Sequence, residues 1–216
     1  MWTQGTELTT AVTDLINGIM AVILLLRMGK LKACGLRNVW MVFYLMLGLV
    51  SLIGFPAHAF VMSAETNHRI WAVLYPCMIA MVLSYYAAVV CNVKGDAAMR
   101  KALMILIPAS AAASAGLIWM DRNMRSRAFI VFGLWCLILL AGILGNLIPA
   151  AKKNPLYKSY LAALALLVTG SILQSMKFIR FTLIFEFNYN GVYHFAILLL
   201  MLVQYWGVCR RIKEIG

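Results

Sequence analysis

Charged residues are scarce in this chain of 216 residues: they make up 12% of it, whereas 64% of the residues are apolar. Soluble domains are about 25% charged and about 45–50% apolar, so the composition excludes both a water-soluble globule and a disordered chain. Acids are scarcer than bases, with 7 Asp and Glu against 19 Lys and Arg. The basic residues fall in short clusters between long apolar runs, which is typical of a polytopic membrane protein and not of a nucleic-acid-binding one.

The sequence also lacks internal repeats, Pro/Ser-rich linkers and low-complexity stretches, so we expect a single domain over residues 1–216. The first residues lack the basic segment of a cleavable signal peptide and carry an acid at Glu7, so the first apolar run is expected to stay in the protein as a helix. We expect an integral membrane protein of a bacterial plasma membrane, with membrane lipid as its partner and no nucleic acid.

Apolar runs between the charge clusters predict the helices. A helix that crosses a membrane needs about 20 mostly apolar residues. Such runs lie at about 7–27, 38–63, 70–92, 102–120, 128–150, 159–184 and 191–209. The sixth is interrupted in its second half by Gln174, Lys177 and Arg180. The sequence therefore predicts an all-α bundle of seven transmembrane helices.

The distribution of basic residues predicts the orientation of the bundle. Thirteen of the 19 Lys and Arg lie in the loops after the odd-numbered runs and at the chain end: Arg27, Lys30, Lys32, Arg37, Lys94, Arg100, Lys101, Lys152, Lys153, Lys158, Arg210, Arg211 and Lys213. The other side has Arg69, Arg122, Arg125, Arg127, Lys177 and Arg180. Basic loops stay in the cytoplasm, so we expect the N-terminus outside and the C-terminus in the cytoplasm.

Polar residues gather in the half of the bundle expected to face outward. Glu7, Thr10, Asp14 and Asn17 are spaced three, four and three apart, which places them along one stripe of the first helix. An ionisable group in the hydrocarbon costs about 2.5–3.5 kcal/mol or more, so each marks a candidate functional site. This stripe is expected to face protein or water.

Two histidines are expected at a similar depth in the same half. His58 lies about five residues before the end of the second run, and His194 about one turn into the seventh. Gln174 and Lys177 in the sixth run reach the same half, with Lys177 about as deep as Asp14. The set as a whole comprises Glu7, Asp14, Asn17, His58, Gln174, Lys177, Asn190, Tyr193 and His194.

Simpler roles remain open for several of these residues. Asp14 and Lys177 are also compatible with a neutralising ion pair that fixes helix packing. Either histidine alone is compatible with a hydrogen-bonded packing role. Asn188 and Asn190 are compatible with the turn that leads into the seventh helix.

The cluster contains part of a hydrolytic zinc site. Such a site needs about three protein ligands and one open position for water. His58 and His194 are the candidate zinc ligands, and the third would be Asp14, Glu7, Asn190 or His68. A carboxylate of Glu7 or Asp14 that binds no metal would act as general base, and Lys177 would stabilise an oxyanion. Asn17, Gln174, Asn190 and Tyr193 are the candidate ligand-binding residues.

Together these residues resemble a family. The seven-run layout with an external N-terminus, Asp14 with Asn17, His58, and the Tyr193-His194 pair is similar to the alkaline ceramidase-related superfamily, which includes the progestin and adiponectin receptor-like proteins. The resemblance implies a zinc-dependent enzyme that cleaves lipid amides such as ceramide, with zinc held by a histidine of the second helix and an HxxxH pair of the seventh.

The sequence departs from the pattern of this family at three positions. Asn190 stands where the family has the first histidine of the HxxxH pair. Gly54 stands where the family has serine, four residues before His58, and Arg69 stands where the enzymes have aspartate, eleven residues after it.

Three functions are therefore expected from the sequence. The first is a membrane-embedded hydrolase, with zinc as a candidate cofactor, that acts on a lipid amide or ester in an outward-facing cavity. The second is a non-catalytic protein of the same fold that binds or senses a lipid or small ligand. The third is an ion-coupled transporter, which the apolar inner halves of the helices disfavour. Haem ligation by His58 and His194 is a minor alternative.

Overall fold

The computed structural model describes residues 1–124, 128–182 and 186–215. Arg125 and Arg127, which we counted in the outer loops, lie outside the described residues, as do residues 183–184 of the sixth predicted run. The described residues form seven helices and two strands: α1 (Thr6–Gly29), α2 (Gly35–Ala59), α3 (Ala64–Lys94), α4 (Asp96–Met124), α5 (Ala128–Lys153), α6 (Tyr157–Ser175), β1 (Arg180–Thr182), β2 (Glu186–Asn188) and α7 (Tyr189–Ile215). The predicted all-α fold is confirmed.

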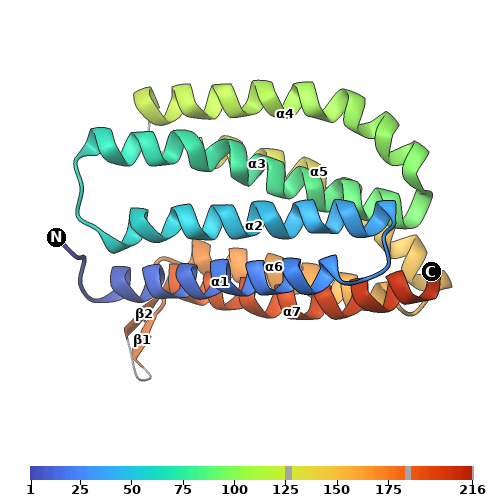
Figure 1. The fold of residues 1–216 in the computed structure, drawn as a ribbon. Helices are drawn as coiled ribbons and strands as arrows, with labels where there is room; N and C mark the ends of the chain where they lie inside the picture. Colours follow the sequence, from blue (N-terminus) through green and yellow to red (C-terminus); the bar gives the residue numbers. More distant parts are fainter. Residues whose placement is uncertain (125–127, 183–185, 216) are drawn as a thin grey trace.

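The helices run up and down alongside one another, and the two chain termini lie at opposite ends of the bundle (Figure 1). We call the end where α1 begins and α2 ends the histidine end, because His58, His68 and His194 all lie in helix segments at that end. The opposite end, where α7 ends, is called the basic end. The thirteen Lys and Arg residues named above lie at this end, in the terminal turns of the helices and the loops between them.

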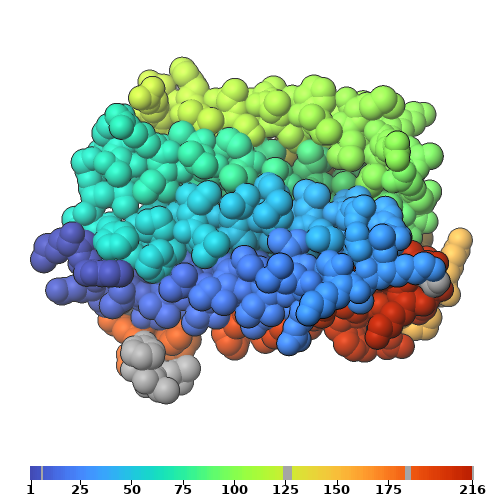
Figure 2. Space-filling view, in the orientation of Figure 1, coloured from blue at the N-terminus to red at the C-terminus, as the bar shows by residue number. Residues whose placement is uncertain are grey.

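Six helices close into a ring. In that ring α1 packs between α2 and α7, α3 packs on α2, α5 contacts α3 and α6, and α6 packs on α7. The remaining helix, α4, lies outside the ring against α3 and α5, at the edge of the molecule in the space-filling view (Figure 2). Most of the surface of α4 is consequently apolar and exposed, as shown by Met104 and Ile105, which are 70% and 71% exposed.

The length and apolar character of the helices indicate a membrane protein. Six of the described helices, all except α6, are long and apolar enough to cross a membrane. Large apolar side chains on α1, α4, α5 and α7 point away from the bundle, including Ile16, Ile107, Leu137 and Trp206. Such a surface is unfavourable in water and is expected where lipid covers it.

The sixth helix is shorter than the sequence predicted. The predicted run continued to residue 184, whereas α6 ends at Ser175 and the backbone turns at Met176. An antiparallel hairpin follows, in which Arg180 pairs with Asn188 and the rings of Phe181 and Phe187 stack with centroids 5.4 Å apart. Ending the helix here keeps the charged Lys177 and Arg180 side chains exposed to solvent instead of extending them along the apolar bundle.

The interior of the ring holds large aromatic side chains that come from several helices. The indole of Trp40 on α2 contacts Tyr85 on α3 and Tyr160 on α6, with ring centroids 5.3 Å and 5.7 Å apart. The Tyr85 hydroxyl donates a hydrogen bond of 2.8 Å to Gln204 Oε1 on α7. These contacts join α2, α3, α6 and α7 at the centre of the bundle.

Candidate functional site

The polar stripe of α1 faces α2 and α7 at the histidine end. Glu7 lies in the first turn of α1, and His58 lies in the last turn of α2. The His58 Nδ1 atom is 3.0 Å from Glu7 Oε2. The His58 side chain is 23% exposed and that of Glu7 is 46% exposed, so this pair is the more exposed part of the site.

A second pair lies two turns further along α1. Asp14 Oδ1 is 3.5 Å from His194 Nδ1 on α7, and both side chains are nearly buried, at 9% and 12% exposure. Thr13 Oγ1 is 3.1 Å from the same nitrogen, and Asn17 Nδ2 donates to the His194 carbonyl oxygen at 2.9 Å. His194 is thus fixed to α1 by three neighbouring side chains.

A glycine on α2 provides the room for Asp14. A Cβ atom added to Gly54 would lie 3.0 Å from Asp14 Oδ2, closer than nearly all real contacts of a Cβ atom. The absence of a side chain at position 54 therefore lets the Asp14 carboxylate fit between α1 and α2. The same glycine is one of the three departures from the ceramidase-related pattern.

The two histidine–carboxylate pairs form one cluster, because the rings of His58 and His194 lie with centroids 6.2 Å apart. Oxygen acceptors surround the Nδ1 atom of His194, including Asp14 Oδ1 and the Thr10 carbonyl at 3.3 Å. Nδ1 therefore carries the proton in the neutral ring, and Nε2 presents a lone pair. The same argument applies to His58, whose Nδ1 contacts Glu7. The site therefore mainly presents hydrogen-bond acceptors.

A neighbouring network of amides holds the start of α7. Asn188 Oδ1 accepts hydrogen bonds from the backbone N–H groups of Asn190 and Gly191 at 2.9 and 3.0 Å, and from Thr10 Oγ1 at 3.2 Å. Asn188 therefore caps α7 and ties it to α1. Gln174 Nε2 on α6 donates to Asn190 Oδ1 at 3.1 Å. This geometry supports the simpler interpretation of the two asparagines as the turn into α7.

Tyr193 lies next to the histidine–carboxylate cluster, whereas Lys177 lies outside it. Tyr193 lies beside His194, with ring centroids 5.9 Å apart, and packs near Gly170 of α6. Lys177 lies beyond the end of α6 and is exposed. Its predicted depth, level with Asp14 inside a helix, is wrong because α6 ends at Ser175. Asp14 contacts His194, and the described residues show no ion pair between Asp14 and Lys177.

The described residues do not assemble a zinc site. No group of three or more His, Cys, Asp and Glu side chains among them is placed to hold a metal ion. His68, one candidate for a third ligand, pairs instead with Asp121 of α4, with 2.6 Å between Nδ1 and Oδ2. Asn190, another candidate, binds Gln174. The cluster brings two imidazoles and two carboxylates together, but no three of these side chains are placed as a zinc centre needs among the described residues.

Sequence reasoning missed three features of the site. Thr13 does not follow the three- and four-residue spacing of the polar stripe on α1. Its contact with His194 therefore depends on where α7 packs and could not be predicted from the sequence. The role of Gly54 depends on the approach of α1 to α2. The pairing of His68 with Asp121 joins α3 to α4, and Tyr75 supports it by donating to Asp121 Oδ1 at 3.1 Å. No local sequence signal indicates such long-range pairs.

Comparison with known protein families assigns the chain to one of them. Residues 9–213 match the model of a family of unknown function, DUF6962. The chain belongs to the DUF6962 family. This match covers nearly the whole bundle, including Asp14, His58 and His194, and leaves Glu7 just outside it. No curated protein matches this DUF6962 member. Membership in DUF6962 assigns no activity, so the similarity to the ceramidase-related superfamily stays a prediction.

Proposed function

We propose that this protein binds the headgroup of a lipid, or a small polar ligand, at the histidine end without chemical turnover. One observation supports the proposal above all: the Glu7–His58 and Asp14–His194 pairs meet in one cluster on three helices. No three His, Cys, Asp or Glu side chains among the described residues are placed to hold a metal ion, and Lys177 lies beyond the end of α6. The cluster therefore has features of a binding site, and it lacks both the set of three metal ligands and the Lys177 ammonium group that the predicted zinc hydrolase would use.

The chemistry of the cluster suggests which ligand it binds. Ionised carboxylates only accept hydrogen bonds, and the two Nε2 atoms also present lone pairs. A ligand that donates several hydrogen bonds and carries positive charge, such as a protonated primary amine, is complementary to this set. A quaternary ammonium group has the same charge but no N–H, so it lacks that complementarity. We therefore propose an amine-bearing headgroup.

Two lipids that differ in this one property test the proposal. Purified protein is placed in nanodiscs that contain phosphatidylethanolamine or phosphatidylcholine, and the lipid retained after detergent exchange is counted by mass spectrometry. We expect wild-type protein to retain the ethanolamine lipid preferentially. Asp14→Asn and Glu7→Gln should each weaken this preference about tenfold or more, since a charge-assisted hydrogen bond contributes about 1.5–3 kcal/mol.

The matched control for these variants is Glu65→Gln, which removes an exposed acid at the same end that binds Arg69. It should leave the preference unchanged. Equal retention of the two lipids by wild-type protein would contradict the proposal. An equal loss in the Glu65→Gln variant would also contradict it, because the effect would then come from overall charge.

A hydrolase is the second candidate, and the Glu7–His58 pair favours it. An imidazole oriented by a carboxylate is the arrangement of a general base, which in this protein would have to activate water. The test is the release of fatty acid from lipid amides and esters by purified protein. Turnover that is lost in His58→Gln and kept in Glu65→Gln would favour the hydrolase over the binding protein. About one zinc per chain in elemental analysis would restore the zinc-dependent form of this candidate.

We further propose that the protein crosses the membrane seven times with the N-terminus outside. The positions of the basic clusters support this orientation, whereas the placement of the termini at opposite ends (Figure 1) and the length of α6 support seven crossings. The 19 residues of α6 extend about 28 Å, close to the thickness of the hydrocarbon core of about 30 Å. A bacterial plasma membrane, the expected location, stays a prediction.

Accessibility of single cysteines tests the orientation. In a variant without native cysteines, Ser63→Cys lies at the histidine end and Lys30→Cys at the basic end. On intact cells, a maleimide that cannot cross membranes should label position 63 and label position 30 only after lysis. The reverse pattern would contradict the proposed orientation.

A further inference from the structure

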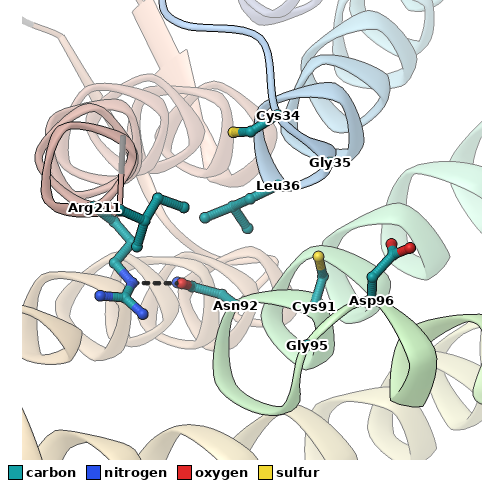
Figure 3. Close-up of a pocket in the computed structure, with 9 residues that line it drawn as sticks. Cys34, Gly35, Leu36, Cys91, Asn92, Gly95, Asp96 and Arg211 are labelled. Atoms are coloured by element: carbon teal, nitrogen blue, oxygen red, sulfur yellow. Dashed lines mark hydrogen bonds between the residues drawn. The ribbon is translucent and has the colours of Figure 1, made fainter.

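A pocket of about 420 Å³ opens at the basic end, far from the cluster described above. Its walls come from the start of α2, the end of α3, the start of α4 and the end of α7. Figure 3 shows Arg211 of α7 and Asn92 of α3 on one side, with Gly35 of α2 and Asp96 of α4 on the other.

The pocket contains a fixed positive charge. Arg211 Nε donates to Asn92 Oδ1 at 3.0 Å, and its Nη1 donates to Glu214 Oε2 at 3.3 Å. The guanidinium also lies over the ring of Tyr157, 5.8 Å from its centroid. The Arg211 side chain is 24% exposed, and it is therefore well placed to bind an anion without moving far.

Buried donors without acceptors lie beside this charge. Asn92 is 93% buried, since its exposure is 7%, and its Nδ2 has no hydrogen-bond partner among the described residues. Trp40 Nε1 and the Tyr160 hydroxyl, which belong to the core of the bundle and do not line the pocket, are also buried without a partner in the described structure. A buried polar group without a partner costs about 1–3 kcal/mol. This part of the bundle is therefore complementary to acceptor oxygens.

Two helix termini add to the positive potential. The pocket is bordered by the N-terminal ends of α2 and α4, where backbone N–H groups are not used within the helix. Gly95 precedes α4 with φ of +88°, a conformation that glycine adopts readily. A Cβ atom added there would have no neighbouring atom within 4 Å, so the backbone at Gly95 has free space beside it.

Two acids near the pocket are already neutralised by arginines. Asp96 lines the pocket and binds Arg100, with 2.8 Å between Asp96 Oδ2 and Arg100 Nη2. Glu214 binds Arg211. Lys94 and Lys213, from the ends of α3 and α7, add positive charge at the same end. The charges within the Arg211–Glu214 and Arg100–Asp96 pairs offset each other, so the two lysines leave a net positive charge at this end, which favours an anion.

We propose that this pocket binds a phosphate group through Arg211, Asn92 and the N-terminal ends of α2 and α4. Phosphate carries several acceptor oxygens, and guanidinium groups bind it in a planar geometry. The phosphate could belong to a soluble compound or to a lipid headgroup, because basic pockets between transmembrane helices bind anionic headgroups. The site is separate from the histidine end, so it does not depend on the function proposed there.

The test measures the thermal stability of the full-length protein in detergent. One set of samples receives sodium phosphate, with sodium chloride at equal ionic strength as reference. A second set receives phosphatidic acid in mixed micelles, with phosphatidylcholine as reference. We expect a concentration-dependent rise in the unfolding temperature with at least one phosphate probe. A rise with phosphatidic acid alone would identify a lipid headgroup, whereas a rise with both would show that the phosphate group suffices.

Neighbouring arginines provide a matched pair of variants. Arg211→Gln removes the charge inside the pocket and should weaken the effect about tenfold, which corresponds to about 1.4 kcal/mol. Arg210→Gln removes the same charge one residue away, where Arg210 lies exposed over Trp206, and should have little effect. Asn92→Asp keeps the size of the side chain and its contact with Arg211 but adds negative charge, so it should abolish binding in a folded protein.

Two results would overturn the proposal. If neither phosphate probe stabilises wild-type protein beyond its reference, the pocket binds no phosphate. If Arg210→Gln and Arg211→Gln weaken the effect equally, the anion is attracted by the basic end in general and not by this pocket.

Discussion

The hydrogen bond between Tyr85 and Gln204 allows a direct test of how the centre of the bundle is held together. Replacing Tyr85 with Phe removes only the hydroxyl, which donates to Gln204 Oε1 at 2.8 Å. The ring contacts with Trp40 and Phe43 stay available because they involve the ring and not the oxygen. The experiment therefore isolates one hydrogen bond.

The magnitude follows from the burial of Gln204. Its side chain is fully buried, and Nε2 already has no partner among the described residues. After the change Oε1 would lose its partner as well, and leaving a buried group unpaired costs about 1–3 kcal/mol. Measured hydrogen bonds between transmembrane helices average about 0.6 kcal/mol and reach about 1.7. We expect Tyr85→Phe to lower the free energy of unfolding by about 1–1.7 kcal/mol, near the upper end of that range.

The assay is equilibrium unfolding in mixed detergent and SDS micelles, followed by circular dichroism. The matched control is Tyr86→Phe, the same change at the next residue, whose hydroxyl makes no hydrogen bond to a described residue. It should alter the free energy of unfolding by less than about 0.5 kcal/mol. The double variant Tyr85→Phe/Gln204→Met removes both polar partners and should recover most of the lost stability.

Two outcomes would refute this reasoning. Equal effects of Tyr85→Phe and Tyr86→Phe would show that the hydroxyl of Tyr85 has no special partner. A double variant that is less stable than Tyr85→Phe alone would show that Gln204 stabilises the bundle through some other contact.

Three further changes have predicted outcomes. Asn188→Ala removes the cap of α7 and should lower the free energy of unfolding by about 1–2 kcal/mol, whereas Asn188→Asp should keep most of it; equal losses in the two variants would contradict the capping role. Asp121→Ala removes the buried partner of His68 and Tyr75 and should cost about 1.5–3 kcal/mol, compared by thermal unfolding with Glu65→Ala, an exposed acid that should matter little. Lys177→Gln should leave both stability and lipid retention unchanged, because Lys177 is exposed beyond α6; a clear loss of lipid retention would show that Lys177 reaches the ligand.

The amino-acid sequence alone determined the class of the protein and most of its helices. Long apolar runs separated by short charged clusters have few physical solutions, because a backbone in lipid must satisfy its hydrogen bonds internally. Six of the seven predicted runs therefore coincide with helices, and the ends of these helices lie no more than six residues from the predicted ends. The stripe from Glu7 to Asn17 could also be predicted, since helical spacing is a local property.

Tertiary structure decided which of these polar residues meet. The sequence placed His58 and His194 at one depth, but only the packing of α1 between α2 and α7 pairs them with Glu7 and Asp14. It also decided that Lys177 stays apart, because α6 ends earlier than hydropathy indicated. The basic-end pocket arises in the same way, because the start of α2, the junction between α3 and α4, and the end of α7 come from three distant parts of the chain. Periodicity and composition act over a few turns of one helix, whereas these contacts depend on how separate helices approach one another.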